Sequence, residues 1–205
     1  MSRDHYLEPY REATAYYGTD FEVTLWASRR TQVRRFEVFT EMMELSGKRL
    51  LDAGSSRGDL VAFLAERGVS YGSYVGLDGV EQVIAFARTR ELPRTEFHCG
   101  DFLQDTSLLR IGDPQVVCIS GTLNTMTERQ VLSLLDAAWT ATSDALLFNF
   151  LSDLALPEAP PQIGPSVRHR TSRLMRWATG LTGHVHYRQD YLRLGHDATI
   201  LMRKG

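Results

Sequence analysis

The chain has 205 residues, with 23 lysines and arginines against 25 aspartates and glutamates, and a formal net charge of −2. This length is sufficient for one α/β domain with a substantial core. The near-neutral charge implies no large basic surface, so nucleic acid is not an expected partner. We find no apolar run of about 18 residues and no charged-then-apolar leader, so neither a membrane span nor a secretory signal is predicted. Cys99 and Cys118 lie in apolar, strand-like runs, which favours reduced, buried thiols in a cytoplasmic protein.

The first 46 residues are predicted to form an N-terminal helical cap ahead of the main domain. Glu8-Pro9 favours a helix start, since proline suits the first turn, and Gly18 favours its end. A longer helix is expected over 21–45, where apolar residues recur at three- and four-residue spacing. Its first half is crowded with arginines, which form either a solvated basic face or a face from which one arginine reaches a ligand: Arg29, Arg30, Arg34 and Arg35.

The stretch 50–68 reads as a strand, a tight glycine turn and a helix. A short apolar run leads into Asp52-Ala53-Gly54-Ser55-Ser56-Arg57-Gly58, and an apolar-rich helical pattern follows. Glycine suits such a turn because it tolerates positive φ and because its missing Cβ lets a ligand lie against the backbone. The amides at the helix start then face that ligand. This pattern predicts the opening of a Rossmann-like unit.

The segment 52–58 resembles the first motif of class I S-adenosylmethionine-dependent methyltransferases, an acid followed by G-x-G-x-G, with Ser56 at the middle glycine. The resemblance covers roughly residues 48–204. It implies an α/β fold, a Rossmann-like three-layer sandwich over 47–205 with a seven-stranded, mostly parallel sheet whose last strand is antiparallel. It also implies S-adenosylmethionine as the cofactor, held here by Asp52, Gly54, Ser55, Ser56 and Gly58.

Two later strand ends agree with this resemblance in order and spacing. The second predicted strand ends at Asp78-Gly79, and an acid there can accept both ribose hydroxyls of a nucleoside. The third ends at Asp101-Phe102, where the family often has an acid that bonds the adenine amine and a residue that packs on the ring. The alternatives are a turn aspartate at Asp78, and an exposed acid beside a core phenylalanine at 101–102.

A fourth, nearly continuous apolar strand ends at Ser120-Gly121, on the carboxyl edge where such sheets bind ligands. Some small-molecule methyltransferases place an arginine from a preceding helix on the methionine carboxylate, and Arg30 occupies the corresponding place. A guanidinium fork fits a carboxylate well. The stretch 120–124 lacks the Asn/Asp-Pro-Pro-aromatic box of enzymes that methylate nucleic acids or glutamine, which argues against those acceptors.

The second half of the chain continues the alternation of predicted strands and helices. Thr127 and Gln130 form a capping box for a helix to Thr142, the proline-rich stretch 156–166 reads as a loop, and a further helix is expected over 171–181. His184 and His186 share a strand face without an evident third ligand, so no metal site is predicted. The remaining predicted strands are 115–121, 144–152, 184–188 and 198–202, with helices expected between the first five strands.

These features predict a methyltransferase that acts on an oxygen or nitrogen of a small-molecule acceptor. His169 and Tyr17 are candidate general bases by location. A nicotinamide-dependent oxidoreductase is the main rival, but its G-x-G-x-x-G fingerprint would place Ser56 and Asp59 at the second and third glycines, and that carboxylate would meet the pyrophosphate. A non-catalytic adenosyl-ligand-binding protein stays open, because fold does not imply activity.

Overall fold

The computed structural model describes residues 6–159 and 161–205, so the first five residues of the expected cap and Pro160 of the proline-rich loop lie outside it. The described residues form a seven-stranded sheet in the order β3-β2-β1-β4-β5-β7-β6. Strands β1 to β5 run parallel, and β7 is antiparallel to both β5 and β6. The predicted mostly parallel sheet with a reversed last strand is confirmed. The strands are β1 (Arg49–Ala53), β2 (Ser73–Asp78), β3 (Thr95–Cys99), β4 (Val116–Ile119), β5 (Ala145–Leu151), β6 (Val185–Arg188) and β7 (Asp197–Arg203).

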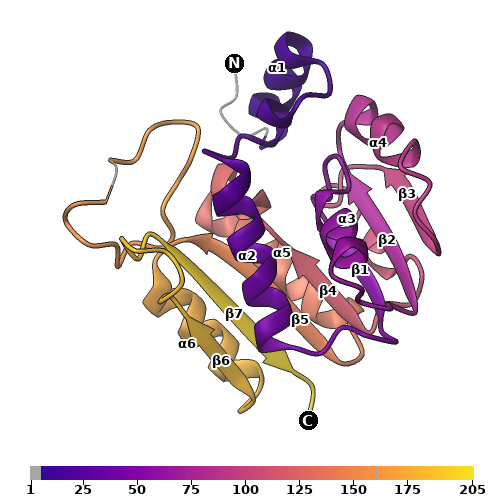
Figure 1. The fold of residues 1–205 in the computed structure, drawn as a ribbon. Helices are drawn as coiled ribbons and strands as arrows, with labels where there is room; N and C mark the ends of the chain where they lie inside the picture. Colours follow the sequence, from indigo (N-terminus) through magenta and orange to yellow (C-terminus); the bar gives the residue numbers. More distant parts are fainter. Residues whose placement is uncertain (1–5, 160) are drawn as a thin grey trace.

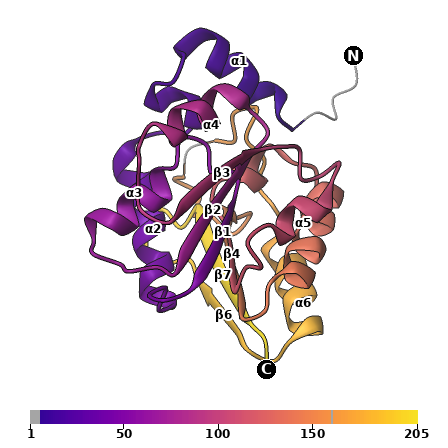
Figure 2. The ribbon, with the colours of Figure 1, turned by 90° about the vertical axis from the view of Figure 1, so that its right-hand side faces the viewer.

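Helices cover both faces of the sheet, as Figures 1 and 2 show. One face carries α2 (Arg29–Met42), α3 (Asp59–Glu66) and α4 (Glu81–Arg88). The other face carries α5 (Glu128–Ala141) and α6 (Thr171–Leu181). The first helix, α1 (Glu8–Tyr17), lies beyond the carboxyl end of the parallel strands (Figure 1). This arrangement is the three-layer sandwich that the resemblance implies.

Two apolar cores fill the space between the layers, one on each face. Successive strand residues point to opposite faces, so Leu50 joins one cluster and its neighbour Leu51 the other. All residues of β4 are buried, as expected for a central parallel strand. Cys118 on that strand is a buried free thiol, whereas Cys99 is exposed, so its predicted burial is wrong. Cys99 is the last residue of β3, an edge strand that has a neighbour on one side alone.

The expected helix over 21–45 is interrupted. Phe21–Thr24 forms a 3-10 helix, and Leu25 then adopts a left-handed conformation with φ of 57°. Ser28 starts a new helix, because its hydroxyl accepts a hydrogen bond from the backbone N–H of Thr31 at 3.2 Å. The break sets Trp26 apart from both helices. Apolar periodicity alone did not reveal it.

Two further predictions concern helix positions on the other face. The capping box of Thr127 and Gln130 is present at the start of α5, as predicted. Between β3 and β4, however, the chain forms a 3-10 helix (Thr106–Arg110) instead of the expected α-helix. Gly112, with φ of 74°, and Pro114 follow closely and prevent its extension. A third 3-10 helix (Thr122–Thr125) follows β4.

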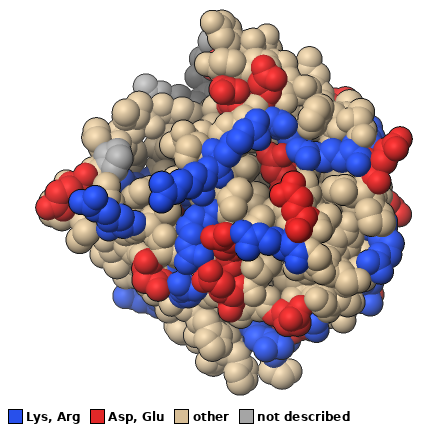
Figure 3. Space-filling model, viewed as in Figure 1, with Lys and Arg blue, Asp and Glu red and all other residues tan. Residues whose placement is uncertain are grey.

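Charged side chains of both signs alternate over the face that α2 covers (Figure 3). Arg34 pairs with Glu41 at 2.5 Å, and Arg188 contacts the same glutamate at 2.6 Å. Arg67 pairs with Glu37 at 2.5 Å. The outer face of α2 is therefore a solvated surface on which charges of opposite sign compensate one another. Among the described residues, no helix has the length and apolar character needed to cross a membrane.

Candidate active site

A cavity lies where the strand order reverses, between β1 and β4 at the carboxyl edge of the sheet. In open α/β sheets this switch point is the usual place for ligands. We call it the switch-point cavity; its volume is about 40 Å³. Its lining comes from the strand ends and from the N-terminal segment: Tyr6, Leu7, Tyr10, Thr24, Trp26, Gly54, Ser56, Asp78, Gly79, Phe102, Ser120, Gly121 and Thr122.

Gly54 makes the turn after β1 and has a φ of 88°. A Cβ at this position would lie 1.8 Å from Oγ1 of Thr122, so no other residue fits without displacement. The Thr122 hydroxyl donates to the carbonyl of Ala53 at 3.1 Å. The turn after β1 is therefore fixed directly to the segment that follows β4, and both contribute to the floor of the cavity.

Asp78 stands at the end of β2 and connects the glycine turn to α4. Its Oδ2 accepts from the backbone N–H of Ser56 at 2.9 Å, and its Oδ1 accepts from that of Val80 at 3.0 Å. Burial raises the pKa of Asp78 to about 6, while these amide hydrogen bonds act in the opposite direction. Asp78 and Ser56, two of the residues predicted to bind the cofactor, both line the cavity.

Asp101 and Phe102, after β3, meet the N-terminal segment. The hydroxyl of Tyr6 donates to Oδ1 of Asp101 at 3.0 Å, and the Tyr6 ring centroid lies 5.8 Å from that of Phe102. Phe102 lines the switch-point cavity. Asp101 instead faces a neighbouring groove of about 310 Å³, which Tyr6 and Arg129 also line. Tyr6 therefore contacts both the Asp101 carboxylate and the Phe102 ring, which the resemblance assigns to adenine.

The N-terminal segment forms a roof over the cavity because two glycines allow close approach. A Cβ at Gly79 would lie 2.4 Å from Cδ1 of Leu7, and one at Gly121 would lie 2.4 Å from the indole of Trp26. Sequence reasoning identified both glycines but not the two side chains that pack on them. These contacts join segments far apart in the chain, so no local pattern signals them.

Asn149 of β5 fixes the end of β4. Its Oδ1 accepts from the N–H of Gly121 at 2.9 Å, and its Nδ2 donates to Oγ of Ser120 at 2.9 Å. Asn149 is fully buried in an otherwise apolar strand. The sequence signal for this residue was an asparagine within an otherwise apolar run.

Three predicted cofactor residues in or next to the glycine turn do not line the switch-point cavity. Asp52 is 3% exposed and accepts from the hydroxyl of Tyr74 at 2.5 Å, and burial raises its pKa to about 7. Ser55 is buried. Gly58 caps α3 with a φ of 72°. Of the motif residues, Gly54 and Ser56 line the cavity, and the other three do not.

The remaining predicted residues lie away from the switch-point cavity. Arg30 is exposed in the first turn of α2. Tyr17, at the end of α1, is 43% exposed and packs edge-on against Tyr16. His169 is 3% exposed, and its Nε2 lies 2.8 Å from the carbonyl oxygen of Leu123.

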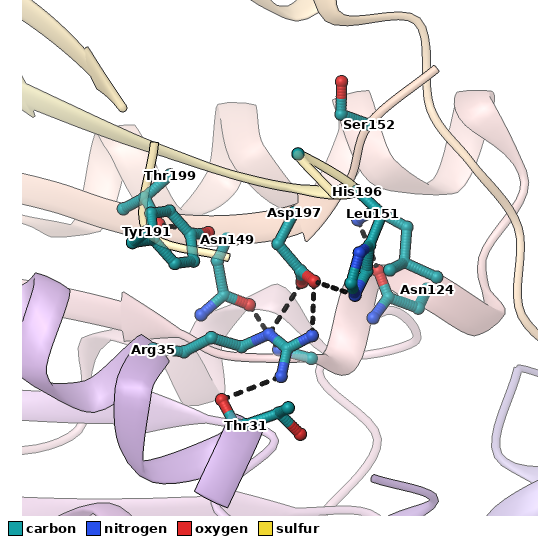
Figure 4. A network of polar contacts seen from close by, with 12 residues as sticks. Thr31, Arg35, Asn124, Asn149, Leu151, Ser152, Tyr191, His196, Asp197 and Thr199 are labelled. Atoms are coloured by element: carbon teal, nitrogen blue, oxygen red, sulfur yellow. Dashed lines mark hydrogen bonds and ion pairs between the residues drawn. The ribbon is translucent and has the colours of Figure 1, made fainter. Parts of the chain in front are cut away.

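A second cavity of about 240 Å³ lies beside the ends of β4 and β5, against the proline-rich loop. It borders a buried polar network centred on Asp197 at the start of β7 (Figure 4). Arg35 donates to both carboxylate oxygens of Asp197, at 2.6 and 2.5 Å, and Nε2 of His196 lies 3.2 Å from Oδ2. Sequence reasoning missed this network. Adjacent His-Asp residues before a strand were a weak signal for it.

No group of three or more histidines, cysteines, aspartates or glutamates is arranged to hold a metal ion, as far as the described residues extend. His184 precedes β6 and His186 lies within it, and both are exposed.

No protein-family model matches this chain, and no curated protein matches it. Solved structures do. Magnesium protoporphyrin IX methyltransferase from Synechocystis PCC 6803, with bound S-adenosylhomocysteine, matches with a TM-score of 0.68 at 13% identity, over 97% of this chain and 94% of that one. Phosphoethanolamine N-methyltransferase 1 from Haemonchus contortus matches with a TM-score of 0.72 at 13% identity, over 99% of this chain and 50% of that one.

An S-adenosylmethionine-dependent methyltransferase from Archaeoglobus fulgidus also matches, with a TM-score of 0.68 at 15% identity, over 92% of this chain and 99% of that one. At these identities the likeness establishes the fold alone. The chain has the class I methyltransferase fold, as the sequence motifs predict, and the match extends over nearly its whole length.

Proposed function

We propose that this chain is an S-adenosylmethionine-dependent methyltransferase that methylates an oxygen or nitrogen of a small-molecule acceptor. The observation that carries the proposal is the switch-point cavity, in which the Gly54 turn and the carboxylate of Asp78 meet at the carboxyl edge of this fold. Two neighbours in fold, named for magnesium protoporphyrin IX and phosphoethanolamine, are named for small-molecule acceptors. The missing Pro-Pro box and the near-neutral charge support the same acceptor class.

The residues at the switch point suit a nucleoside linked to an amino acid. Gly54, Gly79 and Gly121 offer backbone without a Cβ, and Asp78 offers two carboxylate oxygens for ribose hydroxyls. When bound, S-adenosylmethionine supplies a methyl group already activated by a sulfonium, so alignment and exclusion of water contribute much of the rate. We further propose Phe102, Ser56 and Ser120 as wall residues.

The other residues singled out in the sequence are proposed for roles around the cavity. Asp52, Ser55 and Gly58 are proposed to shape the turn. Asp101 is proposed to bind the adenine amine after the hydroxyl of Tyr6 has moved away from it. Arg30 is proposed for the methionine carboxylate, as the resemblance implies. Residues 1–46 are proposed as a cap over the Rossmann-like unit 47–205. His169 and Tyr17 remain candidate general bases, as the sequence analysis predicts.

Binding measurements test the proposal directly. We expect calorimetry to give tighter binding of S-adenosylhomocysteine than of NAD. Asp78→Asn should weaken that binding about 10- to 100-fold, since a hydrogen bond to a charged group is worth about 1.5–3 kcal/mol. Asp113→Asn is the matched control, because the Asp113 side chain is 90% exposed. Tighter binding of NAD would overturn the proposal in favour of the oxidoreductase.

Product analysis separates an enzyme from a non-catalytic binder of the same ligand. S-adenosylhomocysteine should accumulate when S-adenosylmethionine and a panel of small hydroxyl and amine compounds are present. Tight binding without any turnover across that panel would favour the non-catalytic alternative.

A further inference from the structure

The second cavity, beside the proline-rich loop, has the size of a site for a small organic molecule. We call it the side cavity. Its volume is about 240 Å³, whereas a cavity of about 150 Å³ already accommodates benzene. Leu25 and Ile163 line the side cavity and are both exposed. The side cavity therefore meets the solvent at these two side chains, and a ligand reaches it from outside without passing through the switch-point cavity.

One wall of the side cavity is apolar and includes an aromatic ring. Arg35 stacks on the indole of Trp26 at 4.2 Å and thereby holds that ring in place. An indole among aliphatic side chains is a good surface for a flat, apolar ring. The residues of this wall are Leu25, Trp26, Ala27, Leu151, Pro161 and Ile163.

Two amide side chains of the opposite, polar wall are oriented by backbone N–H groups. Oδ1 of Asn124 accepts from the N–H of Leu151 at 3.0 Å, and Oε1 of Gln162 accepts from the N–H of Arg168 at 3.0 Å. The NH₂ groups of the two amides remain, and they can only donate hydrogen bonds. Neither NH₂ group has a hydrogen-bond partner in the part of the chain that the structure describes. The polar wall therefore offers donors.

Arg168 gives the polar wall a net positive charge. Arg35 also lines the cavity, but it pairs with the fully buried carboxylate of Asp197 (Figure 4). Burial lowers the pKa of His196, so its imidazole adds no charge at neutral pH. Nη1 of Arg168 donates to the carbonyl oxygens of Ser152 and His196, at 3.0 and 3.5 Å, and these bonds orient the guanidinium without neutralising it. No aspartate or glutamate is among the described residues that line the cavity.

We propose that the side cavity binds a small aromatic carboxylate, with the carboxylate at Arg168 and Asn124 and the ring against Trp26. A carboxylate only accepts hydrogen bonds, so it matches a wall of donors, and a guanidinium fork fits it well. Inorganic phosphate matches the donors but not the apolar wall. A neutral aromatic amide matches the apolar wall but not the charge. Binding at this site does not depend on the proposed methyl transfer.

Calorimetry on the full chain tests the class of ligand, at neutral pH and without cofactor. Benzoate should bind at least tenfold more tightly than benzamide, its neutral counterpart, because a hydrogen bond to a charged group is the stronger one. It should also bind more tightly than inorganic phosphate, which gains nothing from the apolar wall. Equal affinities for benzoate and benzamide, tighter binding of phosphate, or no binding of benzoate would each overturn the proposal.

Asn124→Asp tests the donor wall with a change of nearly equal shape. The variant keeps an oxygen for the N–H of Leu151 and replaces the donating NH₂ group with a carboxylate oxygen. Affinity for benzoate should fall about 10- to 100-fold. Benzamide should keep its affinity, because its own NH₂ group can donate to the new oxygen. An equal loss for both ligands would contradict the role of Asn124.

Arg168→Gln tests the charge. Affinity for benzoate should fall about 10- to 100-fold, and the preference for benzoate over benzamide should disappear. Arg193→Gln is the matched control, because it removes the same charge from an exposed position outside the cavity lining. Urea unfolding of both variants checks that each is folded. Equal effects of the two variants would mean that the net charge of the chain, and not Arg168, attracts the ligand.

The indole N–H signals in NMR spectra of the full chain locate the bound ligand, with Trp26→Phe to assign the signal of Trp26. Benzoate should shift this signal and leave that of Trp177 unchanged, since Trp177 donates to Asp136 at 2.7 Å between α6 and α5. An unchanged Trp26 signal at saturating benzoate would overturn the proposal. Binding of benzoate without binding of S-adenosylhomocysteine would overturn the proposed function alone, and the reverse result would overturn the carboxylate site alone.

Discussion

Two acidic side chains on neighbouring strands meet different surroundings. Asp52 lies within the core, with the hydroxyl of Tyr74 on Oδ2 and no partner for Oδ1 among the described residues. Asp78 accepts two backbone N–H groups and faces the switch-point cavity. Burial raises both pKa values, to about 7 and about 6. The amide bonds favour the charged form of Asp78, which suits a residue that receives a ligand.

Asp52→Asn should change how stability depends on pH. The pKa of Asp52 is higher in the folded chain than in the unfolded one, so the folded chain keeps a proton between about pH 4 and pH 7 that the unfolded chain releases. Its contribution to stability therefore falls as pH rises through this window. Asparagine has no such loss, so urea unfolding should show the variant gaining about 1–3 kcal/mol relative to the unaltered chain between pH 5 and pH 8.

Asp113→Asn is the control for this measurement, since the Asp113 side chain is 90% exposed and its pair with Arg49 contributes little. The difference between this variant and the unaltered chain should stay constant over the same pH range. A constant difference for Asp52→Asn as well would show that its carboxyl group ionises normally.

Tyr6→Phe should separate folding from ligand binding. The change removes the hydroxyl that donates to Asp101 at 3.0 Å but keeps the ring against Phe102. The unfolding free energy should fall by about 1–2 kcal/mol. Affinity for S-adenosylhomocysteine should rise a few-fold, because the adenine amine no longer competes with the hydroxyl for Asp101.

Calorimetry and urea unfolding measure the two effects in the same samples. Tyr10→Phe is the matched control, because Tyr10 lines the same cavity and its loss leaves the Asp101 bond in place. Weaker binding after Tyr6→Phe would mean that the Tyr6 hydroxyl assists the ligand instead of competing with it.

At the level of helices and strands, short sequence motifs predicted those features that depend on residues close together in the chain. The glycine turn after β1, the acid at the end of β2 and the Thr127 capping box each depend on residues a few positions apart. The break at Leu25 was missed because Ser28 starts a new helix within an apolar pattern that continues. The contact between Tyr6 and Asp101 joins residues 95 positions apart, and no periodicity encodes such a pairing.

Deleting residues 1–20 should open the cavity without unfolding the chain. The switch-point cavity of about 40 Å³ is far smaller than the roughly 300–1,000 Å³ of ordinary ligand pockets, and Tyr6, Leu7 and Tyr10 help to roof it. Ligand entry therefore requires this roof to move. The association rate constant of S-adenosylhomocysteine should rise at least tenfold in the truncated chain, measured by stopped-flow fluorescence.

Circular dichroism should show that the truncated chain still melts cooperatively, at a temperature a few degrees lower. Turnover should fall far more than stability, because the open site admits water. An unchanged association rate would show that the N-terminal segment is no lid, and full turnover would reopen the case for a larger acceptor.

For the whole molecule, one buried ion pair connects the two ends of the chain. Arg35 lies on α2, before the sheet begins, and Asp197 opens β7, the last strand. Their side chains are 5% and 0% exposed, and Arg35 also stacks on Trp26 at 4.2 Å. The pair thus fixes α2, Trp26 in the roof of the cavity and the C-terminal hairpin relative to one another.

Removing one partner should cost far more than removing both. Arg35→Met leaves a buried carboxylate, and Asp197→Leu leaves a buried guanidinium, so each should lower the unfolding free energy by about 3–5 kcal/mol. The double variant replaces both charges with apolar groups of similar size and should lie within about 1–2 kcal/mol of the unaltered chain. The exposed pair of Arg49 and Asp113, treated in the same way, should show coupling below about 1 kcal/mol. Urea unfolding of the four chains gives the coupling energy, and additive losses at Arg35 and Asp197 would mean that the two ends are held by packing instead of by this pair.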